Sequence, residues 1–185
     1  SIELHVPQWR WEGEGRTAEP RHPDRLVIDL DPGPGVGLPE CADVAVLVRE
    51  RLTQIGLDTV PVTSGSKGLQ LYAVLPGVHS SDQIRDTVAQ LAQELSKSHP
   101  DRVVWKMAKD LRPGKIFLDW SQNVAAKTTI CPYSLRGRDA PTVAAPRTWA
   151  EIECGIGGGE LRQLRMDEVL ARVEEQGDLA AVLTQ

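Results

Sequence analysis

Leu26-Val27-Ile28-Asp29-Leu30-Asp31-Pro32-Gly33 decides the fold, because an apolar run that ends in two acids and a Pro-Gly pair predicts a buried β-strand running into a turn. Residues two apart on a strand point to the same side, so Asp29 and Asp31 should project together. Two carboxylates that close repel each other unless a cation joins them. A hard divalent ion, Mg²⁺ or Mn²⁺, suits them because it takes oxygen ligands. The alternative is a strand end with two solvated acids.

Length and composition are those of an ordinary globular protein. The 185 residues are 41% hydrophobic and 25% charged, which predicts one domain over residues 1–185. No apolar run approaches the length of a membrane span, so we expect no membrane partner. The three cysteines lack the spacing of a disulfide framework or a zinc site, and a reducing cytoplasm fits them best. Because the chain opens on Ser1 and continues in strand-like sequence, we expect a piece of a longer polypeptide.

Charge is unevenly distributed along the chain. The net charge is −5, yet residues 101–147 carry nine basic side chains against four acidic ones. Such a stretch can neutralise phosphates locally even when the total is negative. The alternative is a basic surface that has no partner. The basic residues are Arg102, Lys106, Lys109, Arg112, Lys115, Lys127, Arg136, Arg138 and Arg147.

Strand-like and helix-like segments alternate, which predicts an α/β fold. Apolar runs predict strands at residues 26–30, 57–63, 69–75, 102–107 and 115–120. Helical spacing of apolar residues predicts helices at about 39–55, from Ser80 or Ser81 through Leu95, and at 166–176. Between residue 120 and the last helix, prolines and a triple glycine predict extended or looping chain. Strand order does not follow from the sequence.

The stretch Ser64-Gly65-Ser66-Lys67-Gly68 lies between two predicted strands and holds groups that a triphosphate requires. Glycines let backbone N–H groups approach phosphate oxygens, serines offer hydroxyl donors, and Lys67 adds positive charge. The stretch is not a P-loop, since the GxxxxGK[ST] spacing is absent and a strand follows. The alternative is a turn with no ligand.

Asp119 closes the strand expected at 115–120 much as Asp29 and Asp31 close theirs. A third carboxylate could therefore face the first two across neighbouring strands, which is the geometry of a two-metal phosphoryl-transfer site. Downstream, Lys127 and Arg136 could hold the charge of a leaving diphosphate. Taken alone, Asp119 could be a strand-end acid, but all three motifs fall at strand ends and call for the same ligand.

Five motifs in this order resemble the polymerase domain of bacterial ligase D, in the archaeo-eukaryotic primase superfamily, and the mycobacterial and other actinobacterial members are the most similar. The resemblance extends from Ser1 through the final helix and implies a mixed, largely antiparallel β core of the primase and RNA-recognition type, flanked by helices. The motifs are Leu4-His5-Val6-Pro7-Gln8-Trp9, Ile28-Asp29-Leu30-Asp31-Pro32, Ser64-Gly65-Ser66-Lys67-Gly68-Leu69, Leu118-Asp119-Trp120-Ser121-Gln122-Asn123 and Lys127-Thr128-Thr129-Ile130-Cys131-Pro132-Tyr133-Ser134-Leu135-Arg136.

The resemblance implies a primase-polymerase that extends DNA 3′ ends with nucleoside triphosphates during non-homologous end joining. It implies a preference for ribonucleotides and a two-metal site holding Mn²⁺ or Mg²⁺. Asp29 and Asp31 would bind both metals, and Asp119 would lie closest to the primer 3′ hydroxyl. The nucleotide-binding residues would be His5, Ser64, Ser66, Lys67, Gln70, Lys127 and Arg136. The implied partners are DNA ends and, in addition, Ku and an ATP-dependent DNA ligase. The implied location is the bacterial cytoplasm, at the nucleoid.

Two departures from the family pattern matter. Gln70 stands where the family motif has a histidine that is expected to contact the triphosphate. Glutamine keeps a donor and an acceptor but loses the positive charge that a histidine can carry, so activity is expected to be reduced or lost. The family domain also carries a sizeable portion ahead of the segment that matches His5, which supplies a pocket for a recessed 5′ phosphate. We therefore expect this chain to be the C-terminal catalytic portion of such a domain.

Three functions compete at this point. The first is a metal-dependent nucleotidyltransferase acting on DNA ends. The second is a catalytically weakened module that binds DNA ends or nucleotides, which Gln70 and the shorter N-terminal part favour. The third is a metal-dependent phosphohydrolase or nuclease, which shares the three carboxylates but gives no special reason for Ser64, Lys67 and Arg136.

Overall fold

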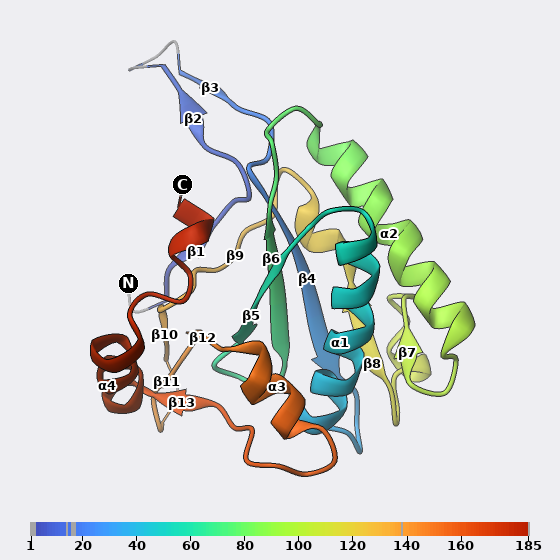
Figure 1. The fold of residues 1–185 in the computed structure, drawn as a ribbon. Coiled ribbons are helices and arrows are strands. Elements are labelled where there is room, and N and C mark those ends of the chain that lie inside the picture. The colour runs from blue at the N-terminus through green and yellow to red at the C-terminus, as the bar shows by residue number, and fades with distance from the viewer. Residues whose placement is uncertain (1–2, 14, 16–17, 138, 185) are drawn as a thin grey trace.

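The computed structural model describes residues 3–13, 15, 18–137 and 139–184. Arg138 of the basic stretch and the first two residues lie outside the described residues. A six-stranded sheet with the order β12-β5-β6-β4-β8-β7 crosses the molecule (Figure 1). Its neighbouring strands are antiparallel except for β7 and β8. The strands are β4 (Arg25–Pro32), β5 (Thr59–Thr63), β6 (Leu69–Val74), β7 (Val103–Val104), β8 (Ile116–Asp119) and β12 (Ala145–Pro146). The mixed, largely antiparallel core predicted from the sequence is confirmed.

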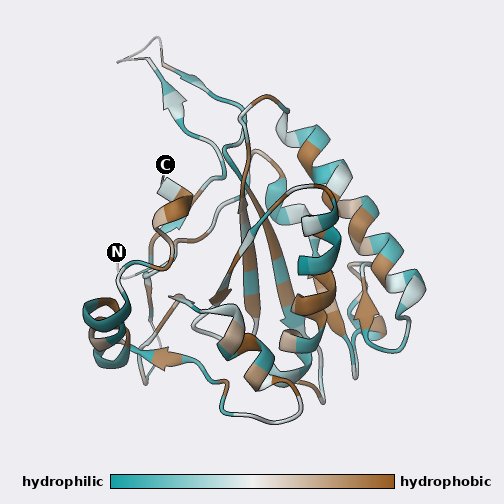
Figure 2. Ribbon diagram, in the orientation of Figure 1, coloured by the Kyte–Doolittle hydropathy of each residue, from teal (hydrophilic) through white to brown (hydrophobic). Residues whose placement is uncertain are grey.

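Helices α1 (Leu38–Gln54) and α2 (Ser81–Ser98) cover one face of this sheet (Figure 1). Leu26, Ile28 and Leu30 of β4 point toward them and are almost fully buried. Alternate residues of β6 and β8 share this face, and apolar stripes of both helices complete the larger core (Figure 2). Burial of this apolar surface is the main driving force that holds the helices on the sheet.

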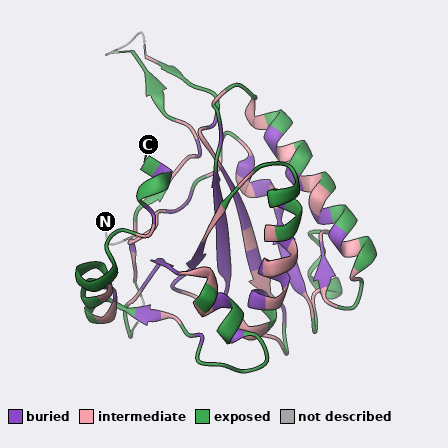
Figure 3. Ribbon diagram, in the orientation of Figure 1, coloured by how far each residue is buried: buried purple, intermediate pink, exposed green. Residues whose placement is uncertain are grey.

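The other face of the sheet carries a smaller apolar core and then the acidic residues. Val27 and Tyr72 are buried there, together with Ile130 and Leu183. Ile130 belongs to β9 (Thr129–Ile130), which pairs with β1 (His5–Val6), and Leu183 to the 3₁₀ helix η4 (Ala181–Thr184). Figure 3 shows the central strands buried between these layers. Because side chains alternate along β4, Asp29 and Asp31 follow Val27 on this face.

The expectation of extended or looping chain beyond residue 120 is wrong where the chain is helical, and the extended segments pair into short strands. A three-stranded sheet forms from β10 (Leu135–Arg136), β11 (Thr142–Val143) and β13 (Leu164–Arg165), and α3 (Trp149–Gly155) lies between β12 and β13. The 3₁₀ helix η3 (Trp120–Asn123) follows β8 directly. Contacts with distant residues hold these short elements: Trp149 Nε1, for example, donates to Thr59 O at 2.8 Å.

The predicted boundaries of two helices hold closely, whereas one predicted strand is shorter than expected. The last helix, α4 (Met166–Gln176), has the predicted limits and stops at Gly177, whose φ of 75° suits a glycine. Helix α2 starts after Ser80, whose hydroxyl accepts from Gln83 N. The strand expected at 102–107 is limited to Val103–Val104.

A β-hairpin of β2 (Trp11–Glu12) and β3 (Glu19–Pro20) projects from the body (Figure 1). In the described part of the chain, no helix is long and apolar enough to cross a membrane.

Candidate nucleotide and metal site

The structure brings the three predicted aspartates to one region of the sheet. Asp29 lies directly opposite Asp119 in the pairing of β4 with β8, and Asp31 lies opposite Phe117. Asp31 is therefore on the same face as both of the other carboxylates, two residues along the strand from Asp29. Asp29 and Asp31 are half-buried and Asp119 is buried. Strand β4 continues through Pro32, so both aspartates lie within the strand, near the C-terminal end where the sequence predicted them.

Burial and mutual repulsion make this region costly for negative charge. Burial, and then the charges of Asp31 and Asp119, raise the pKa of Asp29 to about 8. Burial and the charge of Asp119 also raise the pKa of Asp31, against the opposing effect of Arg112. A divalent cation would reverse these shifts by favouring the ionised carboxylates. The chemistry of the donor set, carboxylate oxygens from two paired strands, thus fits a hard divalent ion.

Asp119 is engaged with the residues that follow it. Its Oδ1 accepts from Ser121 N at 2.9 Å, its Oδ2 accepts from Gln122 Nε2 at 2.9 Å, and the Ser121 hydroxyl also donates to Oδ1. Across the described ranges, no three His, Cys, Asp or Glu side chains are drawn together closely enough to hold a metal ion. For the three aspartates to hold one ion together, their side chains would have to move closer to one another.

Gln70 lies on the other side of Asp29. It pairs with Asp29 across β4 and β6, and it is 3% exposed. Its amide hydrogen-bonds the Asp29 carboxylate, which lowers the pKa of that group and partly offsets the effect of burial. The Tyr72 hydroxyl donates to Gln70 Oε1 at 3.1 Å and lies 2.9 Å from Ile130 O. The side chain at the position of the family histidine therefore supports a carboxylate from within the sheet.

The turn at residues 64–68, called the 64–68 turn below, is closed by its own first side chain. Ser64 Oγ accepts from Ser66 N at 3.3 Å and from Gly68 N at 3.2 Å. Ser64 N donates to Gly68 O at 3.0 Å. These backbone N–H groups are thus already satisfied within the turn, in contrast to the predicted cradle of free N–H groups. The Ser64 hydroxyl proton and the Lys67 ammonium remain the natural donors to a phosphate.

Gly68 brings this turn against β4. A Cβ at Gly68 would lie 2.1 Å from Leu30 O, so only glycine fits this approach. Exposed Lys67 borders a hollow of about 560 Å³ that begins directly after Asp31. The rest of its lining is Pro32, Gly33, Pro34, Gly35, Val36 and Gly37. The hollow, the turn and the acidic strand end therefore adjoin one another.

Arg136 lies on the other side of the 64–68 turn. Its Nε donates to Ser64 O at 2.9 Å, and its Nη1 donates to Glu3 Oε2 at 3.3 Å. His5 Nε2 lies 3.4 Å from the same carboxylate, so Glu3 joins His5 to Arg136. The positive charge of Arg136 also lowers the pKa of Asp29. His5 and Arg136 thus share one side of the site, as the sequence had suggested.

Lys127 approaches the site from another direction. Its ammonium donates to the hydroxyl of Ser121, which in turn donates to Asp119. Ser66 is half-buried within the 64–68 turn. The predicted residues therefore fall into two groups: the turn with Arg136 and His5, and Lys127 beside Asp119. Asp29 and Gln70 lie on the strands between the two groups.

Several residues of the site were not expected from the sequence. Ser121 and Gln122 follow Asp119 directly, and an acid that caps the next turn is a local signal that could have found them. Arg112 was noted only as part of the basic stretch; its guanidinium stacks on Phe117, 3.7 Å from the ring centre. Gln163 contacts the 64–68 turn from 95 residues away, and no local pattern marks it.

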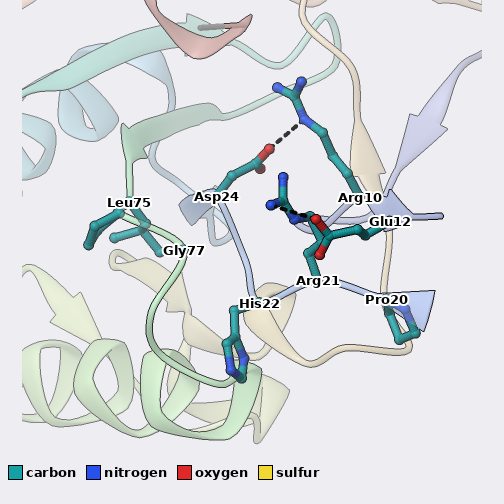
Figure 4. A pocket seen from close by; sticks show the side chains of 9 residues that line it. Arg10, Glu12, Pro20, Arg21, His22, Asp24, Leu75 and Gly77 are labelled. Atoms are coloured by element: carbon teal, nitrogen blue, oxygen red, sulfur yellow. Dashed lines mark ion pairs between the residues drawn. The ribbon is translucent and has the colours of Figure 1, made fainter. Parts of the chain in front are cut away.

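A hollow larger than the one beside Lys67 lies elsewhere, next to the projecting hairpin. It measures about 670 Å³ and is bordered by two ion pairs, Arg10 with Asp24 and Arg21 with Glu12 (Figure 4). Each charge that lines it in these pairs is matched by an opposite one. None of the three aspartates borders this hollow, so it is not part of the candidate site despite its size.

The fold and site define a class of protein: a mixed α/β domain with acidic residues on neighbouring antiparallel strands beside a Ser-Gly-Lys turn. The model of the LigD primase-polymerase domain matches residues 1–180. The chain belongs to this family.

Relatives agree with this assignment. The multifunctional non-homologous end joining protein LigD of Mycolicibacterium smegmatis is 53% identical over 184 residues, which cover 99% of this chain and 23% of that protein. The bifunctional LigD of Bacillus subtilis is 31% identical over 96% of this chain and 28% of its own length. The solved polymerase domain of Mycobacterium tuberculosis ligase D, in complex with DNA, matches with a TM-score of 0.92 at 52% identity. The match covers 98% of this chain and 63% of that one. The chain thus spans about a quarter of the length of these LigD proteins.

Proposed function

We propose that this chain is a metal-dependent nucleotidyltransferase that extends DNA 3′ ends with nucleoside triphosphates in non-homologous end joining. The observation that carries the proposal is the pairing of Asp29 with Asp119, with Asp31 on the same face. The 64–68 turn and the hollow beside Lys67 adjoin this acidic region. Three carboxylates next to cationic and hydroxyl donors suit a reaction in which a triphosphate is bound and attacked.

Each group has a distinct role in this proposal. Asp29 and Asp31 would hold the divalent ions, which would lower the pKa of the attacking hydroxyl and stabilise negative charge on the phosphoryl oxygens. Asp119 would lie nearest the primer 3′ hydroxyl. Lys67, Ser64 and Arg136 would hold the triphosphate, and Lys127 would counter charge near Asp119. No protein nucleophile is needed.

Metal identity, nucleotide preference and partners also belong to this proposal. Mn²⁺ or Mg²⁺ both suit the carboxylate donors, and we propose a preference for Mn²⁺ and for ribonucleotides on the basis of the family resemblance. The relatives are named as non-homologous end joining proteins, and the similar solved domain is in complex with DNA. On that basis we propose that this chain binds DNA ends, and we propose Ku and an ATP-dependent DNA ligase as its further partners.

A primer–template duplex with labelled nucleoside triphosphate and Mn²⁺ tests the proposal. Lengthening of the primer is the expected result. Shortening of the strand would instead identify a nuclease, and release of phosphate without any change in the DNA would identify a phosphohydrolase. Nucleotide binding without either reaction would support the second candidate below.

The second candidate is a binding module with weak turnover, and Gln70 favours it. This side chain is committed to Asp29 and Tyr72 and supplies no positive charge to a triphosphate. Under this candidate, Mn²⁺ and nucleoside triphosphate would bind measurably while primer extension stays near background. Measuring both binding and extension on the same preparation separates the two candidates.

A further inference from the structure

Gln163 contacts the 64–68 turn at two points, Gly65 and Gly68. Its Oε1 accepts from Gly65 N at 2.7 Å, and its Nε2 donates to Gly68 O at 3.1 Å. A single primary amide thus pairs with one donor and one acceptor of the turn backbone, as a neighbouring β-strand would. The side chain is half-buried and comes from the segment just before β13.

The turn is fastened from two further directions. Thr142 Oγ1 donates to Gly65 O, and Arg136 Nε donates to Ser64 O at 2.9 Å. Thr142 also pairs with Arg165 across β11 and β13, so the strand that follows Gln163 is joined to the strand that carries Thr142. Each strand of the small sheet therefore has a side chain that contacts the turn on it or next to it. Arg136 lies on β10, Thr142 lies on β11, and Gln163 directly precedes β13.

Gly65 needs this external support. Its φ of +68° lies in the left-handed region, and a Cβ there would lie 2.8 Å from the backbone carbon of Val143. A glycine in this conformation has many alternatives when its hydrogen bonds are lost. Ser64 and Lys67, the proposed phosphate donors, lie on either side of Gly65 and Ser66. The directions of their side chains therefore depend on how firmly the turn is held.

We propose that Gln163 is a positioning residue that fixes the 64–68 turn in the geometry that binds the triphosphate. This inference rests on the proposed nucleotidyltransferase function and deepens it. Gln163 contacts backbone and not substrate, so its effect is on nucleotide affinity through Ser64 and Lys67. Positions of donors fixed in advance reduce the ordering cost that binding must otherwise meet.

Three variants test the assignment. Gln163→Met keeps the length and volume of the side chain and removes both hydrogen bonds, whereas Gln163→Ala also removes the packing. Gln93→Ala, at an exposed position on α2, is the control. We expect both Gln163 variants to bind Mn²⁺-nucleoside triphosphate about tenfold more weakly, the loss of one to two neutral hydrogen bonds. KM for the nucleotide should rise while kcat changes by less than about threefold.

Amide exchange of Gly65, followed by NMR without nucleotide, provides a readout that is independent of turnover. Exchange should accelerate at least about tenfold in Gln163→Met and stay unchanged in Gln93→Ala. Unchanged exchange and affinity in Gln163→Met would overturn the inference. Tighter binding would also overturn it, because it would mean that Gln163 blocks the Gly65 N–H. If the wild type neither binds nor extends, the proposed function fails, whereas the exchange result still judges the support of the turn.

Discussion

Asp29 has Asp31 two residues along its own strand and Asp119 directly across from it, and the three charges cannot be ionised together without cost. The pKa of Asp29 is raised to about 8 in the absence of a cation, against an ordinary value of 3.8. Proton and metal should therefore compete for this carboxylate. Any cation that binds here does so at the expense of the proton, so its affinity should rise with pH.

A pH dependence of stability follows for the metal-free protein. Between pH 3.8 and about 8, folded Asp29 holds a proton that the unfolded chain has lost. The folded state binds more protons in this window, so the free energy of unfolding should fall as pH rises through it. Denaturation with chelator present, measured from pH 5 to 9, should show this slope. Asp29→Asn should flatten it, and parallel slopes for both proteins would contradict the raised pKa.

Gln70, which lies opposite Asp29 on β6, leads to a prediction about the rate of primer extension. Gln70→His would place an imidazole against the Asp29 carboxylate, and its protonated form would both favour the ionised acid and offer charge to a phosphate. We expect at least about fivefold faster primer extension near neutral pH, from one charge-assisted hydrogen bond of about 1 kcal/mol. Gln93→His serves as the control. Equal rates for wild type and Gln70→His would mean that glutamine is harmless here.

Among the elements, η3 is joined to β4 through the side chain of Asn123. Asn123 Oδ1 accepts from Val27 N at 2.9 Å, and its Nδ2 donates to Val27 O at 2.7 Å. Asn123 thus completes the edge of β4 beyond the last residue that pairs with β8, which is Asp119. This link sets where Asp119 ends its strand relative to Asp29.

Asn123→Ala would leave both buried backbone groups of Val27 without these partners. We expect the free energy of unfolding to fall by about 2–4 kcal/mol, the cost of unpaired buried polar groups. Urea denaturation measures this change, with Gln93→Ala expected to stay within about 0.5 kcal/mol of wild type. A loss for Asn123→Ala as small as that of the control would show that η3 is held by other contacts.

Apolar periodicity in the sequence predicted the elements whose defining signals all lie within a short stretch of chain. Helices α1, α2 and α4 and strand β4 were expected because their apolar spacing, caps and flanking glycines lie within a few residues. Helix α3 was missed although Thr148 and Glu151 form a capping box before it. Short strands such as β10 and β11 carry two residues each, which is too few for a period to be read. Their pairing depends on partners far along the chain.

The candidate site divides in the same way. Alternation along one strand placed Asp29 and Asp31 on one side, and similar strand ends suggested Asp119. The order of strands, which brings β8 rather than β5 next to β4, is a property of the whole sheet. Gln163 meets the 64–68 turn only because β13 joins β11, and no segment of the sequence contains that information.

At the scale of the whole molecule, the sheet separates the face that carries the larger apolar core from the face that carries the candidate site. Helices α1 and α2 cover the first, and the aspartates lie on the second, beyond its smaller core. The basic stretch at 101–147 is divided between roles, because Arg102 pairs with Asp43 at 2.7 Å and buried Arg147 pairs with Glu151 at 2.8 Å. Arg112, Lys127 and Arg136 remain close to the aspartates or the turn.

Primer extension titrated with Mn²⁺, in wild type and in Asp29→Ala, is the measurement on which the whole account depends. Asp86→Ala, at an exposed position of α2, is the matched loss of a carboxylate. We expect extension to rise and saturate with Mn²⁺ in the wild type and in Asp86→Ala. Asp29→Ala should fall by at least about a thousandfold at every Mn²⁺ concentration, since it loses a ligand common to both ions. Unchanged extension by Asp29→Ala would contradict the assignment of a metal-dependent nucleotidyltransferase site to this sheet.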